Sequence, residues 1–385
     1  MTATLRKRAV VTAIVGMTVG AMAALAPLAA TSASAAPARA AKPTVWRLVY
    51  RPHTQGEMTG VAATGRTNAW AVGFLTEGPE QQIVNQLFVV HWNGQAWHRV
   101  TIPGGDGFIA TSVEATSASN VWIFGQNDFA PFNKAVFRYD GAHWHEMAAP
   151  SYVTPAGGAF SVGGQPVVLS ASDVWMPTDF SSCTYPASGA PKCASILWHW
   201  DGNTWTSYTL AASIDSLAGV APGDVMAVGV AWKKSQLEGG VTVAFRWNGT
   251  QWMPVRVPKK PVYEYAGVGM ASAHDVWIGA GTDNGNEGFA MHWNGHRWTT
   301  TPSSVEAGND VVLDGHGGVW LGNFGHWTGR RWIDAHWASP ITGIGAAMLV
   351  KIPGTRGSYW GSGSVMVRGR PSKSYPGVML YGRLP

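Results

Sequence analysis

Short apolar runs separated by turns fill most of this chain. Runs such as Leu87–Val90 and Ile196–Trp198 have the length and the β-branched and aromatic content of strands. Each is followed by an aromatic residue, a turn dipeptide ending in glycine, two further residues and a tryptophan. Because Asn-Gly and Asp-Gly tolerate positive φ angles, the pattern predicts a hairpin with a type I′ turn. The hairpin motif occurs six times, as Trp92–Trp97, Tyr139–Trp144, Trp200–Trp205, Trp247–Trp252, Trp293–Trp298 and Trp327–Trp332.

A second motif, Asn or Asp, a small residue and a tryptophan, lies upstream of each hairpin. The acidic or amide side chain can close the preceding turn, and the tryptophan then begins a strand. A run of small residues such as Leu217–Val220 comes before that turn, which suits a crowded inner strand. The copies are Asn68–Trp70, Asn120–Trp122, Asp173–Trp175, Asp224–Met226, Asp275–Trp277 and Gly318–Trp320, with a weaker seventh at Ser358–Trp360.

The two motifs together define a repeating unit of four strands. Repeats of about 49 residues are typical of β-propeller blades. The stretch Val378–Gly382 is a third strand without a fourth, and Val45–Tyr50 is a fourth strand without a third. We therefore predict an all-β, seven-bladed propeller of four-stranded blades across residues 45–385, in which the N-terminal strand completes the last blade. Such closure removes exposed sheet edges.

The first 44 residues have a different composition. Arg6, Lys7 and Arg8 precede an apolar stretch that reaches about Ala30, and a small-x-small sequence ends at Ala35. This order predicts a secretory signal peptide over residues 1–35, followed by a linker at 36–44. The apolar stretch is long enough for a membrane anchor, but its small residues and the cleavage sequence favour removal. We expect a secreted protein with no membrane span after processing.

The charge balance changes once the leader is set aside. The whole chain has 27 basic and 22 acidic residues, a net charge of +5, and the leader holds three of the basic ones. A mature net charge near +2 gives no reason to expect nucleic-acid binding. Cys183 and Cys193, the two cysteines, fall in one loop of the third blade. In a secreted protein this predicts a disulfide that stabilises the loop.

Loop lengths indicate which face recognises a ligand. Connections between second and third strands and between blades are long and varied, and in a propeller both sets emerge on one face. Ser362–Pro376 is expected to be one of these long connections. Aromatic side chains in such loops provide platforms for the C–H face of a sugar, and neighbouring lysines favour an anionic polymer. The candidate ligand-binding residues are Trp232, Trp337, Tyr263, Tyr265, Lys233 and Lys234. The alternatives are that the rings pack between blades and that the lysines are a solvated surface.

Catalytic motifs are missing. The sequence has no phosphate-binding loop, no Gly-x-Ser-x-Gly, no His-Glu-x-x-His and no Cys-x-x-Cys. His143 and His145 could share one face of a strand, but two ligands do not make a metal site. Glu114 is the most unusual carboxylate, because it lies on an expected inner strand near the channel, where a structural role is favoured. We expect neither an enzyme nor a metal or other cofactor.

The hairpin motif is similar to the Asp-box turn of sialidase-like propellers, but it lacks that motif's Ser/Thr and one spacer residue. The Arg-Ile-Pro motif of sialidases is also missing; the nearest string is Arg256–Pro258. The chain more closely resembles secreted actinobacterial propellers with repeated Asp-Val-Trp and Trp-Asn-Gly-x-x-Trp. Some of these are lectin subunits of umbrella-type toxin particles, so the resemblance implies recognition of a target-cell surface.

These observations lead to a functional expectation with two alternatives. We expect a lectin-like protein that binds a cell-surface glycan or cell-wall polymer, alone or with other subunits of a secreted toxin complex. The first alternative is a protein–protein interaction scaffold without a sugar site. The second is a glycoside-cleaving enzyme, which requires two carboxylates facing one cleft about 5 to 10 Å apart.

Overall fold

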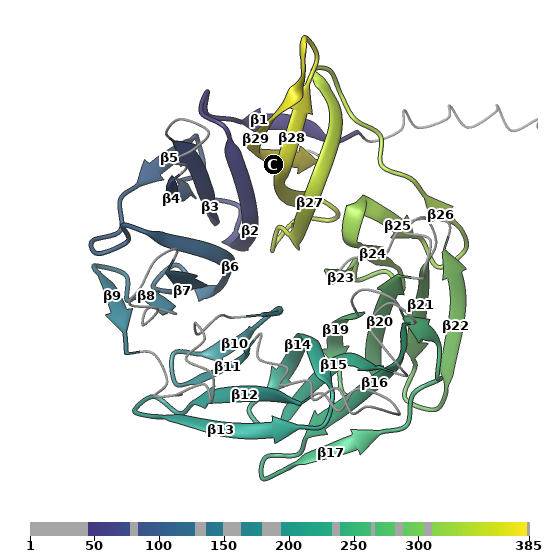
Figure 1. Ribbon diagram of the computed structural model, residues 1–385. Coiled ribbons are helices and arrows are strands. Elements are labelled where there is room, and N and C mark those ends of the chain that lie inside the picture. The colour runs from purple at the N-terminus through teal and green to yellow at the C-terminus, as the bar shows by residue number, and fades with distance from the viewer. Residues whose placement is uncertain are drawn as a thin grey trace, which may run out of the picture. The chain divides into compact units, whose positions relative to one another are not determined.

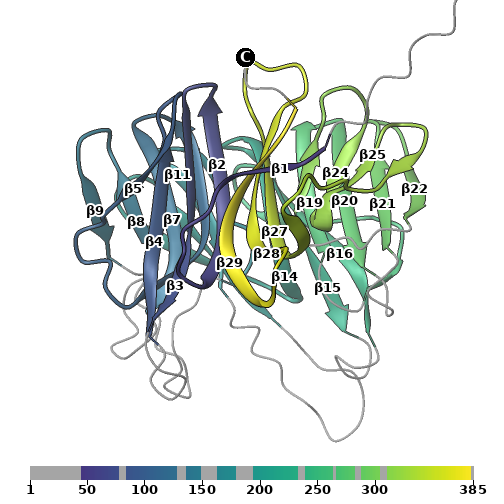
Figure 2. The ribbon, with the colours of Figure 1, turned by 90° about the horizontal axis from the view of Figure 1, so that it is seen from above.

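Seven antiparallel four-stranded sheets surround a central channel, so the protein is a seven-bladed β-propeller, as predicted (Figure 1). The computed structural model describes residues 45–77, 84–127, 136–148, 163–178, 194–232, 239–262, 266–281, 288–303 and 310–382. The expected signal peptide and linker lie outside these residues. Figure 2 shows the ring from the side, with the strands running between its two faces. Within the described residues, no helix has the length and apolarity needed to cross a membrane.

The blades follow one another along the chain. The first contains β2 (Gly56–Gly65), β3 (Asn68–Glu77), β4 (Val84–Trp92) and β5 (Trp97–Val100). The second contains β6 (Phe108–Ser117), β7 (Asn120–Asn127), β8 (Val136–Tyr139) and β9 (Trp144–Met147). The third contains β10 (Val167–Ser170), β11 (Asp173–Pro177), β12 (Ser195–Trp200) and β13 (Trp205–Leu210). The fourth contains β14 (Ser213–Ala221), β15 (Asp224–Trp232), β16 (Gly240–Trp247) and β17 (Trp252–Val255), with β18 (Pro261–Val262) added beside β16.

The last three blades keep the same order of strands. The fifth contains β19 (Ala266–Ser272), β20 (Asp275–Gly281), β21 (Gly288–Trp293) and β22 (Trp298–Ser303). The sixth contains β23 (Val311–Leu313), β24 (Val319–Leu321), β25 (Gly325–Trp327) and β26 (Trp332–Ile333), with the 3-10 helix η2 (Gly322–Phe324) between β24 and β25. The seventh contains β27 (Ile341–Lys351), β28 (Tyr359–Val367), β29 (Arg370–Tyr381) and β1 (Arg47–Tyr50).

The N-terminal strand closes the ring in the way the sequence predicted. β1 pairs antiparallel with β29, with Arg47 opposite Leu380 and Leu48 opposite Met379. One residue earlier, the Trp46 N–H donates to the carbonyl of His336 at 2.8 Å, and the Trp46 carbonyl accepts from the N–H of Ala338 at 2.8 Å. The first described strand therefore belongs to the last blade (Figure 1).

The prediction of a long loop at residues 362–376 is wrong. β28 and β29 run through this stretch as one long hairpin, with Val365 opposite Tyr375 and Val367 opposite Arg370. Gly369, with φ of 83°, lies in the short turn that joins them. A residue with positive φ allows a tight reversal, so the small and polar residues of this stretch occupy paired strands.

The hairpin turns are also of a different type from the one predicted. A type I′ turn requires positive φ at two consecutive residues, but at the first hairpin only Gly94 has one, at 96°. The Asn93 side chain explains this, because its Oδ1 accepts from the N–H groups of Gln95 at 2.9 Å and Ala96 at 3.0 Å. The asparagine therefore caps the turn with its side chain. The same pair of bonds is made by Asp140, Asp201, Asn248 and Asn294.

Removing one of these caps is expected to destabilise a single hairpin. In Asp201→Ala, the free energy of unfolding should fall, because two backbone N–H groups lose their acceptor. Asn203→Ala is the matched control, since Asn203 is exposed and contributes its backbone N–H to the turn. Urea unfolding of both variants measures the difference, and equal midpoints would show that the side chain does not stabilise the turn.

Candidate functional site

The central channel is built from seven equivalent positions, one from each inner strand. Each is paired with the third residue of the Asp-Val-Trp motif on the neighbouring strand. Six of them are small or apolar, and the seventh is Glu114. In blade order they are Ala62, Glu114, Val167, Ala218, Gly269, Val312 and Val350. They line a cavity of about 390 Å³.

Glu114 lines this channel, as the sequence suggested, and the pKa of its carboxyl group is raised. Burial raises the pKa of Glu114 to about 8, with the nearby carboxyl group of Asp310 as the second cause. Burial also raises the pKa of Asp310 to about 7, although the N–H of Leu349 donates to its carboxylate and lowers it. Both carboxyl groups line the same cavity. Two carboxyl groups therefore face one cavity, in a wall otherwise rich in apolar residues.

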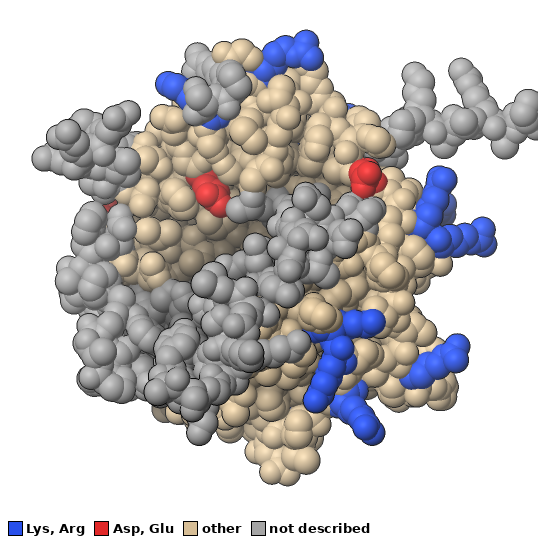
Figure 3. Space-filling model, turned by 45° about the vertical axis from the view of Figure 1, so that its right-hand side comes forward, with Lys and Arg blue, Asp and Glu red and all other residues tan. Residues whose placement is uncertain are grey.

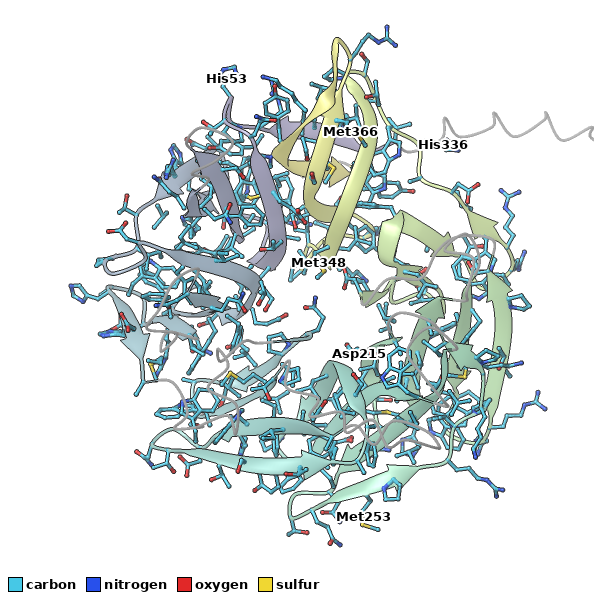
Figure 4. All side chains as sticks on the ribbon, in the orientation of Figure 1. His53, Asp215, Met253, His336, Met348 and Met366 are labelled. Atoms are coloured by element: carbon cyan, nitrogen blue, oxygen red, sulfur yellow. The ribbon has the colours of Figure 1, made fainter. Side chains whose placement is uncertain are left out.

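Other polar groups at the channel tie the blades together. The Asp215 carboxylate accepts from the N–H of Ala266 at 3.1 Å, which joins the fourth inner strand to the fifth. Gln165 Nε2 reaches Met348 Sδ at 3.3 Å, although the two residues come from the third and seventh blades. Figure 4 shows Asp215 and Met348 at opposite sides of the central space. The polar groups at the channel therefore join blades to one another.

The predicted ligand-binding residues are dispersed over the molecule. Trp232 ends β15, where it is half-buried and packs against the apolar cluster between the fourth and fifth blades. Trp337 is half-buried beside Trp46 and Phe324, with ring centroids 6.2 and 4.9 Å away. Neither ring is free of packing, and the two belong to different seams. Tyr263, Tyr265, Lys233, Lys234, Cys183 and Cys193 lie outside the described residues.

His143 and His145 lie at the second hairpin. Their ring centroids are 6.5 Å apart, and His145 Nε2 lies 2.7 Å from Asp140 Oδ2. Hydrogen bonds from the turn to the Asp140 carboxylate, together with His145, lower its pKa. Among the residues that the structure describes, no three His, Cys, Asp or Glu side chains form a group that could hold a metal ion.

The seams between blades follow one packing rule. At the seams that follow the first, third and seventh blades, the tryptophan of the Asp-Val-Trp motif packs against the two hairpin aromatics of the next blade. Trp175, for example, has ring centroids 5.0 Å from Trp247 and 5.2 Å from Trp252. Trp360 contacts Trp92 and Trp97 in the same way at the seam that closes the ring, at 5.3 and 5.1 Å. An indole from one blade therefore packs against a pair of contacting rings of the next blade.

Histidine supports this arrangement from the strand before the hairpin. His199 stacks on Trp175 at 4.1 Å and its Nε2 lies 2.9 Å from Asp173 Oδ1. The same stack recurs with His91, His292 and His326. Their Nε2 atoms lie 2.7, 2.9 and 3.0 Å from side-chain oxygens of Asn68, Asp275 and Asp314. These histidines belong to the scaffold. In the second blade Arg138 replaces the histidine and lies 5.3 Å from the Trp122 ring.

The fourth seam departs from the rule. Met226 stands where the other motifs have tryptophan, opposite the hairpin pair Trp293 and Trp298 of the fifth blade. A hollow of about 270 Å³ remains at this seam. We call it the Met226 hollow, and its lining residues are Met226, Arg246, Val255, Arg256, Val276, Trp293 and Trp298.

Arg246 forms one wall of the Met226 hollow and is already paired. Its Nε and Nη2 atoms donate to Asp224 Oδ1 and Oδ2 at 2.7 and 2.8 Å, a bidentate ion pair. Such a fork fixes the guanidinium group in one orientation. Arg246 occupies the slot of the stacked histidines, but with Met226 beside it there is no indole to stack on.

A second hollow of about 410 Å³ adjoins the first and shares Arg246 and Val255 with it. We call it the Met253 hollow; it is lined by Gly223, Asp224, Arg246, Trp247, Asn248, Met253 and Val255. Met253 is 46% exposed, one of the few large apolar side chains so open to solvent among the described residues. Figure 4 shows it at the outer edge of the fourth blade. Both hollows involve the tight-turn side of the blade, which is opposite the long connections.

Sequence reasoning overlooked this site, although its signal was present. Met226 is the one residue that breaks the tryptophan series at the third position of the repeated motif. A residue that departs from a structural repeat marks a place where the packing of the other blades is not kept. The candidate aromatics Trp232 and Trp337 lie outside the repeat positions, whereas Met226 lies within them.

Several solved structures have folds similar to that of this chain. A structure of YCF48 bound to D1 peptide matches with a TM-score of 0.51 at 15% identity, covering 89% of this chain and 97% of that one. A protein of unknown function from Dyadobacter fermentans matches with a TM-score of 0.51 at 14% identity, covering 88% and 98%. A six-bladed fucose-binding lectin from Aleuria aurantia matches more loosely, with a TM-score of 0.41 at 12% identity, covering 65% and 78%. At these identities the likeness shows the fold alone.

The sequence comparisons found no relatives to add to these structures. No protein-family profile matches the chain, and no curated protein sequence matches it.

Proposed function

We propose that this propeller is a secreted, lectin-like protein that binds a cell-surface glycan or cell-envelope polymer through the Met226 hollow. The observation that carries the proposal is the missing indole at the fourth seam. Trp293 and Trp298 correspond to the rings that pack against an indole at the seams of Trp70, Trp175 and Trp360, but here Met226 replaces the indole and a hollow of about 270 Å³ remains beside the two rings. A flat ring from outside the chain can take that place.

A pyranose fits the chemistry of the Met226 hollow. Its C–H face packs favourably on an indole, and both Trp293 and Trp298 are half-buried, so part of each ring remains accessible. Sugar hydroxyl groups need polar partners at the rim, which Arg246 and Arg256 can supply as N–H donors. Small-molecule sites typically combine an apolar wall with a few fixed polar groups. The expected signal peptide and the resemblance to toxin-particle lectins support a role outside the cell, as the recognition subunit of a larger complex.

Filling the hollow is expected to abolish binding without unfolding the protein. We predict that Met226→Trp weakens binding of residues 36–385 to its glycan by at least about tenfold, equivalent to about 1.4 kcal/mol. Trp122 and Arg138 coexist in the second blade, so an indole beside Arg246 has a precedent in this chain. The measurement is titration of the best ligand from an array of cell-surface glycans and bacterial wall polysaccharides.

Met226→Leu is the matched control, because it retains the volume of methionine and leaves the hollow open. Retained binding in Met226→Leu together with loss in Met226→Trp supports the proposal. Equal binding by both folded variants would place the ligand elsewhere. If no polymer on the array binds and culture supernatant yields a stable partner, the protein is an interaction scaffold. Product release from a bound glycan would instead support the glycosidase alternative, with Glu114 and Asp310 as the first residues to replace.

A further inference from the structure

The charges around the two hollows point to a particular class of polymer. We infer that the Met226 and Met253 hollows together bind a run of an acidic polysaccharide, with the carboxylate of one sugar unit at Arg256. This inference rests on the proposed function, since it specifies the ligand of the same site.

Arg256 provides the uncompensated charge. It is exposed at the end of β17, lines the Met226 hollow, and forms no ion pair or hydrogen bond with any described residue. Arg246 is different, because both oxygens of Asp224 neutralise it. Asp224 is the only carboxylate that lines either hollow, within the described part of the chain. Among the residues that the structure describes, the hollows therefore have one positive charge that no carboxylate pairs with.

Other basic side chains are exposed on the fourth, fifth and sixth blades. Lys259 is exposed shortly after Arg256, and Arg297, Arg330 and Arg331 are exposed at the hairpins of the fifth and sixth blades. Figure 3 shows several Lys and Arg side chains along the right-hand rim of the ring, with few Asp and Glu side chains among the described residues in that view. Positive potential over a surface raises the local concentration of an anionic polymer and speeds its association.

The geometry favours an internal stretch of polymer over a single sugar. The two hollows meet at Arg246 and Val255, so a chain that enters one can continue into the other. In the Met226 hollow the ligand meets Trp293 and Trp298, and in the Met253 hollow it meets Trp247 and the exposed Met253. Each hollow thus offers an apolar surface for one ring. Arg256 lies beside the first of them, where its guanidinium can form a bidentate, charge-assisted pair with a carboxylate.

Sugar acids of defined length test this inference. Trigalacturonate and a hyaluronan tetrasaccharide are the acidic probes, and maltotriose and chitotetraose are the neutral probes of matching length. Titration calorimetry with residues 36–385 should give at least about tenfold tighter binding of an acidic probe than of its neutral counterpart. The affinity should fall as salt increases, because exposed charge pairs are screened. Monomeric galacturonate should bind more weakly than trigalacturonate.

Arg256→Gln should remove most of the preference for acidic probes while retaining residual binding to the aromatic walls. The matched control is Arg297→Gln, since Arg297 is exposed on the neighbouring hairpin but lines neither hollow. Equal affinity for acidic and neutral probes, no binding of either acidic probe, or an unchanged preference in Arg256→Gln would overturn the inference. If neutral glycans bind to the wild-type protein and Met226→Trp loses that binding, the proposed function stands and only the preference for acidic polymers is wrong. If no saccharide binds, both the proposed function and this inference are wrong.

Discussion

Replacing Trp46 by alanine should cost about 3 to 5 kcal/mol of the free energy of unfolding, the range for truncation of a fully buried aromatic residue. The Trp46 side chain is 0% exposed and lies between the sixth and seventh blades. Its ring centroid is 4.4 Å from Phe324, 5.2 Å from Tyr381 and 5.8 Å from Trp320. Truncation leaves a large cavity at the point where the ring of blades closes.

The matched control for this prediction is Val49→Ala. Val49 lies on the same closing strand but is 42% exposed, so its truncation should cost well under 1 kcal/mol. Comparing the urea unfolding midpoints of the two variants shows whether the loss of stability comes from the buried ring at the seam or from any truncation near β1. If both variants unfold at the wild-type midpoint, closure by the N-terminal segment contributes little to stability.

The second large effect concerns the channel. Glu114→Gln should stabilise the protein by about 3 kcal/mol near pH 8 and should have little effect near pH 4. The sign follows from the raised pKa of about 8, whose first cause is burial. Below the ordinary pKa of a glutamate, both the folded and the unfolded chain hold the proton. Between that value and about 8 only the unfolded chain releases it, so the stability of the wild-type protein falls as pH rises through this interval.

Urea unfolding at a series of pH values measures this effect. Glutamine retains the shape of the protonated side chain without an ionisable group, so the variant should lose part of the decline seen in the wild type. Asp310 has a pKa raised to about 7 by burial, and it should maintain a smaller decline of the same sign in the variant. Asp106→Asn, at an exposed carboxylate before β6, is the control. Parallel pH profiles for the wild type and Glu114→Gln would contradict the raised pKa.

The fold could be predicted from the sequence because each blade repeats the same local chemistry. Asn93 and its counterparts mark the hairpins, and the tryptophan series marks the second strands, so the strand count follows directly. The unmatched strand at each end predicted closure by β1. The turn type could not be predicted, because it depends on whether the side chain or the backbone of Asn93 accepts the hydrogen bonds from the N–H groups of the turn. The long hairpin through Gly369 was missed because its small and polar residues resemble those of a loop.

The candidate site was harder to predict. Glu114 could be placed near the channel, but its neighbour Asp310 lies four blades further along the chain, and no sequence pattern joins them. Trp232 and Trp337 stood out because they interrupt the repeat, and the structure packs both against apolar clusters. Met226 was counted as an ordinary copy of its motif. Replacing a tryptophan of the repeat creates space only where the residues that would pack against it remain in place. The sequence does not show that these residues are Trp293 and Trp298.

The paired tryptophans of the hairpins have an optical consequence. At five hairpins two indoles face each other across the last pair of residues, with centroids 5.4 to 5.9 Å apart and interplanar angles of 41 to 50°. Indole transition dipoles at such separations couple, and a skewed pair gives a circular dichroism couplet whose sign depends on the handedness of the skew. Because the five pairs come from one repeated turn, their couplets should add. The folded ring therefore has an intrinsic spectroscopic signal that should vanish as the hairpins open.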